Sequence, residues 1–192
     1  MVNYKIFLAS NSPRRRELLR SICPDYEVRV IEDIDESFPS SLPAEVVPIY
    51  ISQKKAESYK ETLKDGELVI TADTIVVLGN DILGKPENEK AAIAMLNALS
   101  GHTHLVVTGV TLTTNQKQRS FACVTEVDFD ILSDEDIQHY VSQYKPYDKA
   151  GAYGIQEWIG YIGVTAIRGS YFNVMGLPVQ RLYKELQQFT KS

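Results

Sequence analysis

The residues with the clearest potential for chemistry lie near the start of the chain, in residues 10–16. This segment holds Ser10, Ser12 and three consecutive arginines that begin at Arg14. Ser12 followed by Pro13 predicts a helix N-cap and first helical position. A helix N-terminus offers free backbone N–H groups and a partial positive charge, so the segment predicts an anion site that suits phosphate. The alternative is a plain helix cap with solvated arginines.

A second candidate is Asp73, a carboxylate within the apolar run of residues 68–78. An isolated buried charge is costly, so this carboxylate must be paired, hydrogen-bonded or metal-bound. Asp73 could have a functional role, in which it activates water or holds a metal. The alternative is a structural role, in which it caps a neighbouring loop. The acidic residues Asp35 and Glu36 would ligate a divalent cation together with Asp73, although an acidic loop is more often just solvated.

Two lysines and a glutamine complete the set of candidates. Lys85 stands between a glycine and a proline, where it is either a phosphate ligand or an exposed turn lysine. Lys55 lies on an apolar-periodic helix and fits a snorkelling side chain at least as well as a ligand. The glycine-rich residues 148–156 end at Gln156, whose amide can read a base edge as donor and acceptor. The alternative interpretation of residues 148–156 is a plain turn with a buried aromatic residue.

The composition limits the classes of function. With 192 residues and 44% hydrophobic content, the chain can build a substantial core, and we expect one domain over residues 1–192. The formal net charge of -5 predicts no broad surface for nucleic acid, whereas a basic pocket in an acidic shell suits a small polyanion. Cys23 and Cys123 lie outside any metal-ligand spacing and are expected to be structural thiols. Residues 1–5 do not resemble a signal peptide and no segment has the length of a membrane span, so we expect a soluble, cytoplasmic protein without membrane partners.

The pattern of apolar residues predicts an α/β fold with a mixed sheet and flanking helices. Strands are expected at residues 5–9, 26–31, 68–78, 104–113, 119–131 and 159–167. Residues 79–81 are expected to form a turn, and residues 82–86 to lead into another turn. Helices are expected from Pro13 onward and at residues 43–64, 88–99, 133–143 and 177–189. The strands 104–113 and 119–131 read as a long hairpin, which adds antiparallel pairing to the sheet.

Six motifs occur together in the order seen in Maf-like nucleotide pyrophosphatases, which the chain resembles from residue 5 to residue 189. They lie at residues 9–15, 72–74, 84–86, 99–101, 148–156 and 176–178. The resemblance implies an inosine triphosphatase-like α/β fold with two lobes around a deep cleft. It also implies hydrolysis of a nucleoside triphosphate, the small-molecule partner, to the monophosphate and pyrophosphate with Mg²⁺ or Mn²⁺. Such enzymes remove unwanted nucleotides from cellular pools.

The resemblance also assigns roles to single residues. Asp73 matches the family's proton acceptor for water, and Glu36 matches an acidic position that would hold the metal together with Asp73. The remaining matches are to residues that support the triphosphate: Ser10, Ser12, Arg14, Arg15, Lys55 and Lys85.

Three positions resemble the branch of the family that acts on dTTP and UTP. They are Arg14, Thr74 and Gln156, where the branch acting on 7-methyl-GTP typically has Trp, Gln and Glu. A neutral Gln amide can pair with a uracil or thymine edge, whereas a Glu carboxylate suits the N–H donors of guanine. The chain departs from the family after Gln156, where residues 157–159 are Glu-Trp-Ile instead of a glycine-rich continuation.

Two other functions remain open at this stage. One is a 7-methyl-GTP-type or broader nucleotide pyrophosphatase, and the other is a nucleotide-binding regulator of cell division or septum formation. The sequence also leaves open whether the protein forms a homodimer.

Overall fold

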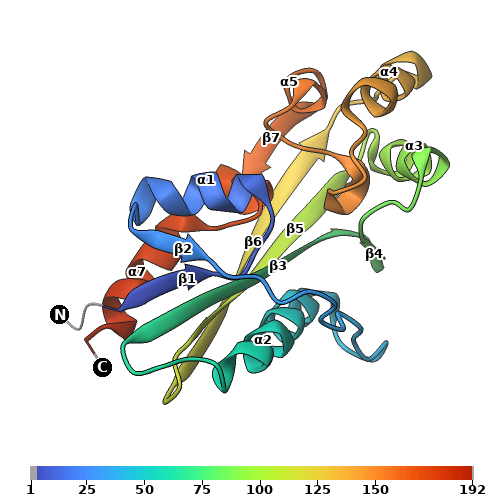
Figure 1. Ribbon diagram of the computed structural model, residues 1–192. Helices are drawn as coiled ribbons and strands as arrows, with labels where there is room; N and C mark the ends of the chain where they lie inside the picture. Colours follow the sequence, from blue (N-terminus) through green and yellow to red (C-terminus); the bar gives the residue numbers. More distant parts are fainter. Residues whose placement is uncertain (1–3, 192) are drawn as a thin grey trace. The chain divides into compact units, whose positions relative to one another are not determined.

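One mixed sheet contains all seven strands of the computed structural model, which describes residues 4–191 (Figure 1). Its strands are β1 (Lys5–Leu8), β2 (Tyr26–Val28), β3 (Glu67–Leu78), β4 (Asp81–Leu83), β5 (Thr103–Thr113), β6 (Gln118–Phe129) and β7 (Val164–Arg168). The strand order is β2-β1-β3-β5-β6-β7, and β4 pairs with β3 outside this path. β1 runs parallel to β2 and β3, whereas the β3–β4 and β6–β7 pairs are antiparallel. The predicted mixed sheet is therefore confirmed.

The chain divides into two compact units, to which β3, β5 and β6 each contribute residues. The first unit contains Met1–Asp73, Thr108–Cys123 and Gly176–Ser192, and the second contains Thr74–Val107 and Val124–Met175. The single domain expected over residues 1–192 stays a prediction, and its first three residues and its last residue lie outside the described part.

Three of the helices begin at capping residues of the sequence. They are α1 (Pro13–Ile22), α2 (Val47–Lys60), α3 (Glu89–Leu99), α4 (Asp134–Tyr144), α5 (Trp158–Gly163), α6 (Tyr171–Met175) and α7 (Val179–Phe189). Short 3₁₀ turns occupy Ala44–Val46 and Ala150–Ala152. The side chains of Ser12, Asn88 and Ser133 cap α1, α3 and α4 by accepting a hydrogen bond from the backbone N–H three residues ahead.

Several of the predicted boundaries were wrong. Residues 159–167 were expected to be one strand, but their first half is α5 and only the second half is β7. A short apolar run fits a buried helical turn as well as a strand. An ideal Cβ at Gly160 would lie 1.9 Å from the carbonyl oxygen of Ile155, so this turn packs directly on the backbone. In addition, α2 ends at Lys60 instead of residue 64, and β2 ends at Val28 instead of residue 31.

In the first unit, helix α2 packs very closely against strand β5. An ideal Cβ at Gly109 would lie 2.3 Å from the backbone carbon of Pro48, so only glycine allows this approach. Figure 1 shows α2 on one side of β1 and β3, with α1 and α7 on the other side. Tyr59 of α2 packs with Phe7 and Val69 from these strands in a buried cluster. The position of α2 is thus set by backbone contact and by apolar packing together.

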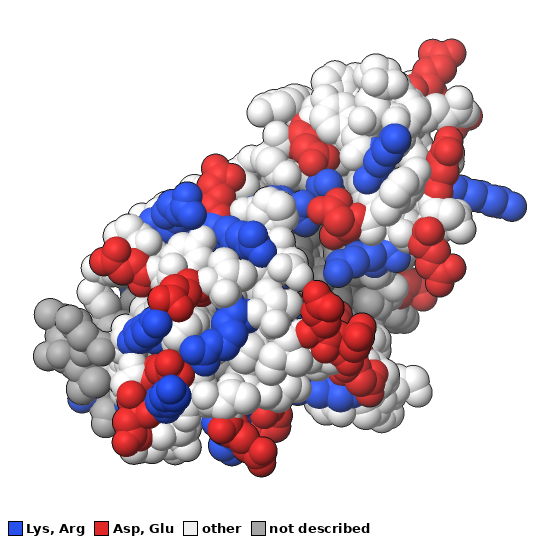
Figure 2. Space-filling model, viewed as in Figure 1, with Lys and Arg blue, Asp and Glu red and all other residues white. Residues whose placement is uncertain are grey.

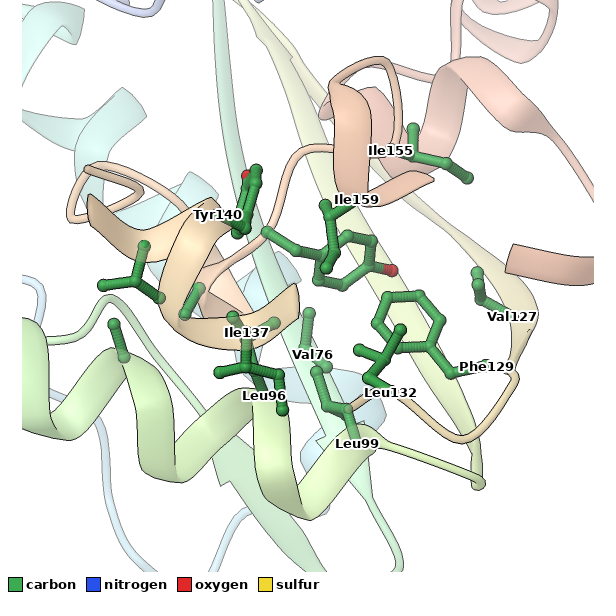
Figure 3. Packing of buried hydrophobic residues seen from close by; sticks show 14 of the residues in the cluster. Val76, Leu96, Leu99, Val127, Phe129, Leu132, Ile137, Tyr140, Ile155 and Ile159 are labelled. Carbon is green, nitrogen blue, oxygen red and sulfur yellow. The ribbon is translucent and has the colours of Figure 1, made fainter. Parts of the chain in front are cut away.

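The second unit has its own hydrophobic core, shown in Figure 3. Leu96 and Leu99 of α3 pack there with Ile137 of α4 and with Ile155 and Ile159 around the start of α5. Because all five side chains are fully or almost fully buried, this core fixes the segment of residues 148–159 that the sequence singled out.

The same core contains a histidine whose ionisation opposes folding. His104 is 1% exposed, its Nε2 lies 2.7 Å from the Tyr153 hydroxyl, and burial lowers its pKa to about 4. In the unfolded chain the imidazole of His104 binds a proton near pH 6.5, whereas in the folded protein it stays neutral down to about pH 4. The contribution of neutral His104 to the free energy of unfolding is therefore complete above pH 6.5 and is lost as the pH falls towards 4. The pKa shift corresponds to a loss of up to about 3 kcal/mol.

Urea unfolding at pH 7.5 and pH 5 tests this expectation. The free energy of unfolding should fall more steeply with pH in the wild type than in His104→Gln, which cannot be protonated. His102→Gln serves as the control because His102 is exposed and lies two residues away. An equal pH dependence in the wild type and His104→Gln would contradict the assignment.

The surface carries both kinds of charge. Figure 2 shows acidic and basic side chains interspersed on the visible face. Cys23 and Cys123 are partly buried free thiols, and burial raises the pKa of both. Among residues 4–191, none of the helices combines the length and the apolar character that a membrane span requires.

Candidate active site

The first unit brings together two of the predicted carboxylates around one lysine. The ammonium Nζ of Lys55 lies 3.0 Å from Oδ1 of Asp73 and 3.0 Å from Oε1 of Glu36. Asp73 is only 9% exposed, whereas half of the Glu36 side chain is exposed to solvent. The buried charge of Asp73 is therefore paired, as its place in an apolar strand required.

Hydrogen bonds between α2 and the sheet explain why Lys55 meets Asp73. The hydroxyl of Thr71 donates to the backbone carbonyl of Ser52 (2.7 Å), and the Ser52 and Thr111 hydroxyls lie 2.8 Å apart. Lys55 follows Ser52 by three residues, so both project from the same face of α2. Asp73 follows Thr71 by two residues and projects from the same face of β3. Docking of Ser52 on Thr71 therefore also places Lys55 against Asp73.

The predicted anion-binding segment follows β1 at the same edge of the sheet. β1 and β3 are parallel with Leu8 opposite Ile70, so residues 10–12 and Asp73 both lie beyond the carboxyl ends of these paired segments. Ser10 is buried, and its Oγ accepts a hydrogen bond from the backbone N–H of Ser12 (3.2 Å). The sequence therefore places the first turn of α1 beside the carboxylate.

Arg15 ties three parts of the first unit together. Its Nη1 donates to the carbonyl of Ala72 (2.9 Å), and its Nε donates to the carbonyl of Gly176 (2.8 Å). Burial lowers the pKa of Arg15 and the negative charge of Asp73 opposes this shift. An arginine remains charged under such conditions, so this group brings a permanent positive charge next to residue 73. Arg14 lies half-buried in the same turn.

The carboxylates suit a divalent cation only in combination with another source of oxygen ligands. In the described part of the chain, no three His, Cys, Asp or Glu side chains gather in a way that could hold a metal. Glu36 and Asp73 nevertheless converge on one positive charge, that of Lys55. Mg²⁺ is usually bound by one or two carboxylates together with substrate phosphates, so this pair fits it. Asp35, considered as a further ligand, forms an ion pair with Lys54 at 2.6 Å.

The second unit holds Lys85 and Gln156. The backbone N–H of Gly151 donates to the carbonyl of Gly84 (3.1 Å), which joins the Lys85 turn to the glycine-rich segment. Lys85 is exposed, and Gln156 is half-buried. Its Oε1 is buried and has no hydrogen-bond partner among the described residues. An unsatisfied buried acceptor is costly, so this oxygen needs a donor that the described residues do not supply.

Sequence reasoning missed a polar network beside Gln156. The carboxylate of Glu157 lies 3.1 Å from Nζ of Lys149, which is 7% exposed, and accepts a short hydrogen bond from the hydroxyl of Tyr140. Burial, followed by the bond to Glu157, raises the pKa of Tyr140. A signal in the sequence was the charged Lys149 directly before Ala-Gly-Ala, since a lysine needs a partner when it is buried.

The sequence model of the family described as Maf-like protein matches residues 5–189. The chain belongs to this family. The resemblance drawn from the six motifs is thus confirmed, and it covers the range over which those motifs were found.

Relatives of this Maf-like protein align along nearly its whole length. The dTTP/UTP pyrophosphatase of Phocaeicola vulgatus is 60% identical over 185 residues, which cover 96% of both chains. The dTTP/UTP pyrophosphatase of Parabacteroides distasonis is 59% identical over 186 residues, which cover 97% of this chain and 96% of the relative. Among solved structures, the Staphylococcus aureus Ham1 protein matches 65% of this chain and 71% of its own, with a TM-score of 0.48 and 19% identity.

The predicted site residues of this Maf-like protein fall into two groups. The first unit holds Ser10, Ser12, Arg14, Arg15, Glu36, Lys55 and Asp73. The second unit holds Thr74, Lys85 and Gln156. Each group stands on the contacts within its own unit, and the cleft implied by the resemblance stays a prediction.

Proposed function

We propose that this protein is a nucleoside triphosphate pyrophosphatase that hydrolyses dTTP and UTP to the monophosphate and pyrophosphate. The observation that carries the proposal is the buried carboxylate of Asp73, held by Lys55 beside Glu36 and the first turn of α1. The names of relatives with about 60% identity support the same substrates. Removal of unwanted pyrimidine nucleotides from the cytoplasmic pool is the physiological role in this proposal.

In the proposed reaction, Asp73 takes a proton from a water molecule that attacks the α-phosphorus in line. The bond from this phosphorus to the oxygen bridging to the β-phosphate breaks, and pyrophosphate leaves. The cations Lys55 and Arg15 and the donors of the α1 turn offset negative charge on the phosphates. A divalent cation held by Glu36 and Asp73 would, when bound, neutralise phosphate charge and make the attacking water more acidic.

The residues of the second unit supply recognition in this proposal. The amide of Gln156 offers an acceptor for N3–H and a donor for a carbonyl oxygen of uracil or thymine. Lys85 adds a compact positive charge for a phosphate oxygen. Thr74 and Arg14 are the other two positions that support pyrimidine substrates, by resemblance to the corresponding branch of the family.

Pyrophosphate release from a panel of nucleotides tests the proposal. With Mg²⁺ or Mn²⁺ present, we expect turnover of dTTP and UTP at least about tenfold above that of CTP and 7-methyl-GTP in kcat/KM. EDTA should abolish the turnover, and added Mg²⁺ should restore it, because the metal would neutralise phosphate charge and make the attacking water more acidic.

Other outcomes of the panel would replace this function by one of the alternatives. Preferred turnover of 7-methyl-GTP would indicate the other branch of the family. Saturable nucleotide binding without any release of pyrophosphate would indicate a nucleotide-binding regulator.

A further inference from the structure

Glu36 lies in a segment without regular secondary structure. Residues 29–43 join β2 to the 3₁₀ turn before α2 and contain neither a helix nor a strand. The first part of this segment is anchored on α2, because the backbone N–H of Ile31 donates to the hydroxyl of Tyr59 (2.7 Å). Ile34 also packs on the apolar cluster that contains Tyr59. Glu36 follows this apolar anchor and depends on polar contacts for its position.

A lysine of α2 holds the residues on both sides of Glu36. Nζ of Lys54 lies 2.6 Å from Oδ2 of Asp35, and it donates to the carbonyl (3.1 Å) and the hydroxyl (3.3 Å) of Ser37. Asp35 in turn accepts hydrogen bonds from the backbone N–H (2.9 Å) and the hydroxyl (2.8 Å) of Ser37. Because these contacts form a network, they order exposed backbone more effectively than an isolated surface ion pair does.

Lys55, the next residue of α2, contacts the carboxylate of Glu36 itself. The same ammonium is paired with Asp73, and both N–O distances are 3.0 Å. Lys55 and a divalent cation would compete for these two carboxylates, so the ion pair with Lys55 cannot hold Glu36 in place for the cation. Lys54 contacts the neighbouring residues instead, which leaves the Glu36 carboxylate available to a metal.

We infer that Lys54 is a positioning residue that holds Glu36 ready to bind the divalent cation of the proposed reaction. The entropy cost of ordering this exposed segment is then met when the protein folds, and not when the metal binds. Groups that orient a metal ligand without touching the metal commonly change metal affinity by about 10–100-fold. This inference rests on the proposed function, from which it takes the metal and the nucleotide. Asp35 is in this view the partner through which Lys54 acts, and not a further metal ligand.

Binding of α,β-methylene-UTP with and without Mn²⁺ tests the inference without turnover. This analogue has a carbon in place of the oxygen at which the proposed reaction cleaves. For the wild-type protein, we expect Mn²⁺ to increase the affinity measured by titration calorimetry. In Lys54→Met this increase should be about tenfold smaller, whereas the affinity without metal should not change.

The sign of the effect separates positioning from simple electrostatics. Removing a positive charge near a cation site would by itself strengthen metal binding and weaken nucleotide binding. The inference predicts weaker metal binding and unchanged metal-free nucleotide binding. Lys54→Arg keeps the charge and the donors, so it should retain most of the effect of Mn²⁺. The matched control is Lys60→Met, which removes a lysine ion-paired with Glu57 on the same helix and should behave as the wild type.

A double-mutant cycle with Asp35→Asn identifies the partner of Lys54. Asp35→Asn should reduce the effect of Mn²⁺ as much as Lys54→Met does, and the double variant should be no worse, because both changes remove one interaction. A loss in Asp35→Asn alone would identify Asp35 as a ligand and would overturn the inference. Additive losses, or an unchanged or larger effect of Mn²⁺ in Lys54→Met, would overturn it as well. Where Lys54→Met does not fold by circular dichroism, Lys54→Gln takes its place.

These measurements are independent of the test of the proposed function. If the wild type releases no pyrophosphate from UTP but shows the Mn²⁺ effect, and Lys54→Met loses it, only the proposed function is overturned. If Mn²⁺ does not change the affinity of the wild type for the analogue, the inference is overturned.

Discussion

Replacing Asp73 by asparagine should slow pyrophosphate release from dTTP by about 10²–10⁴-fold, the usual effect of losing a general base. The amide keeps the shape of the carboxylate but cannot accept a proton from water. Nucleotide affinity should change little, because Lys55 keeps its ion pair with Glu36 and all cationic side chains of the candidate site remain. The loss should therefore appear in kcat rather than in the dissociation constant.

Single-turnover kinetics and nucleotide binding to Asp73→Asn measure the two effects separately. The matched control is Asp128→Asn, which also removes a strand carboxylate from an ion pair, that with Arg168. The control should retain wild-type turnover and should lose little stability, as expected for an exposed pair. A near-wild-type rate for Asp73→Asn would refute the assignment of the base.

Replacing Gln156 by glutamate should reduce kcat/KM for dTTP and UTP by about 10²-fold. A carboxylate accepts hydrogen bonds from N3–H but cannot donate to the carbonyl oxygens of uracil or thymine. It also brings a second negative charge beside Glu157, above Gly154. The result should be selective for these two substrates, since the residues that act on the triphosphate are unchanged.

The nucleotide panel on Gln156→Glu is the measurement, with Gln143→Glu as the control. Gln143 is an exposed residue of α4 in the same unit, so the control adds the same charge away from the predicted site. A uniform loss over all nucleotides would indicate damage to the fold. An unchanged substrate profile would rule out a base-reading role for Gln156.

The sequence predicted well those features that depend on neighbouring residues. The N-cap at Ser12 and the α4 cap at Ser133 were both confirmed, because a cap needs only a side chain and an N–H three residues away. The long hairpin was confirmed as β5 and β6, adjacent strands joined by the turn after Thr113. Local chemistry determines each of these features.

The geometry of the candidate site depends instead on long-range packing. No periodicity indicates that Lys55 pairs with Asp73, because the pair depends on how Ser52 docks onto Thr71. The network of Lys149 with Glu157 was missed for the same reason, as its members come together only when α5 forms. Even α5 was read as a strand, since a six-residue apolar turn has no period long enough to identify it.

The pairing of Lys55 with Asp73 depends on Gly109, a residue far from both in the sequence. This residue carries no side chain and takes part in no chemistry, yet the backbone of Pro48 occupies the space that a methyl group would need. Any larger residue would push the start of α2 outward, and Lys55, two turns farther along the helix, would move with it. The distance between the ammonium of Lys55 and the carboxylate of Asp73 thus depends on a residue that has no reactive group. A substitution at Gly109 is therefore expected to impair the chemistry without altering a single polar atom of the site.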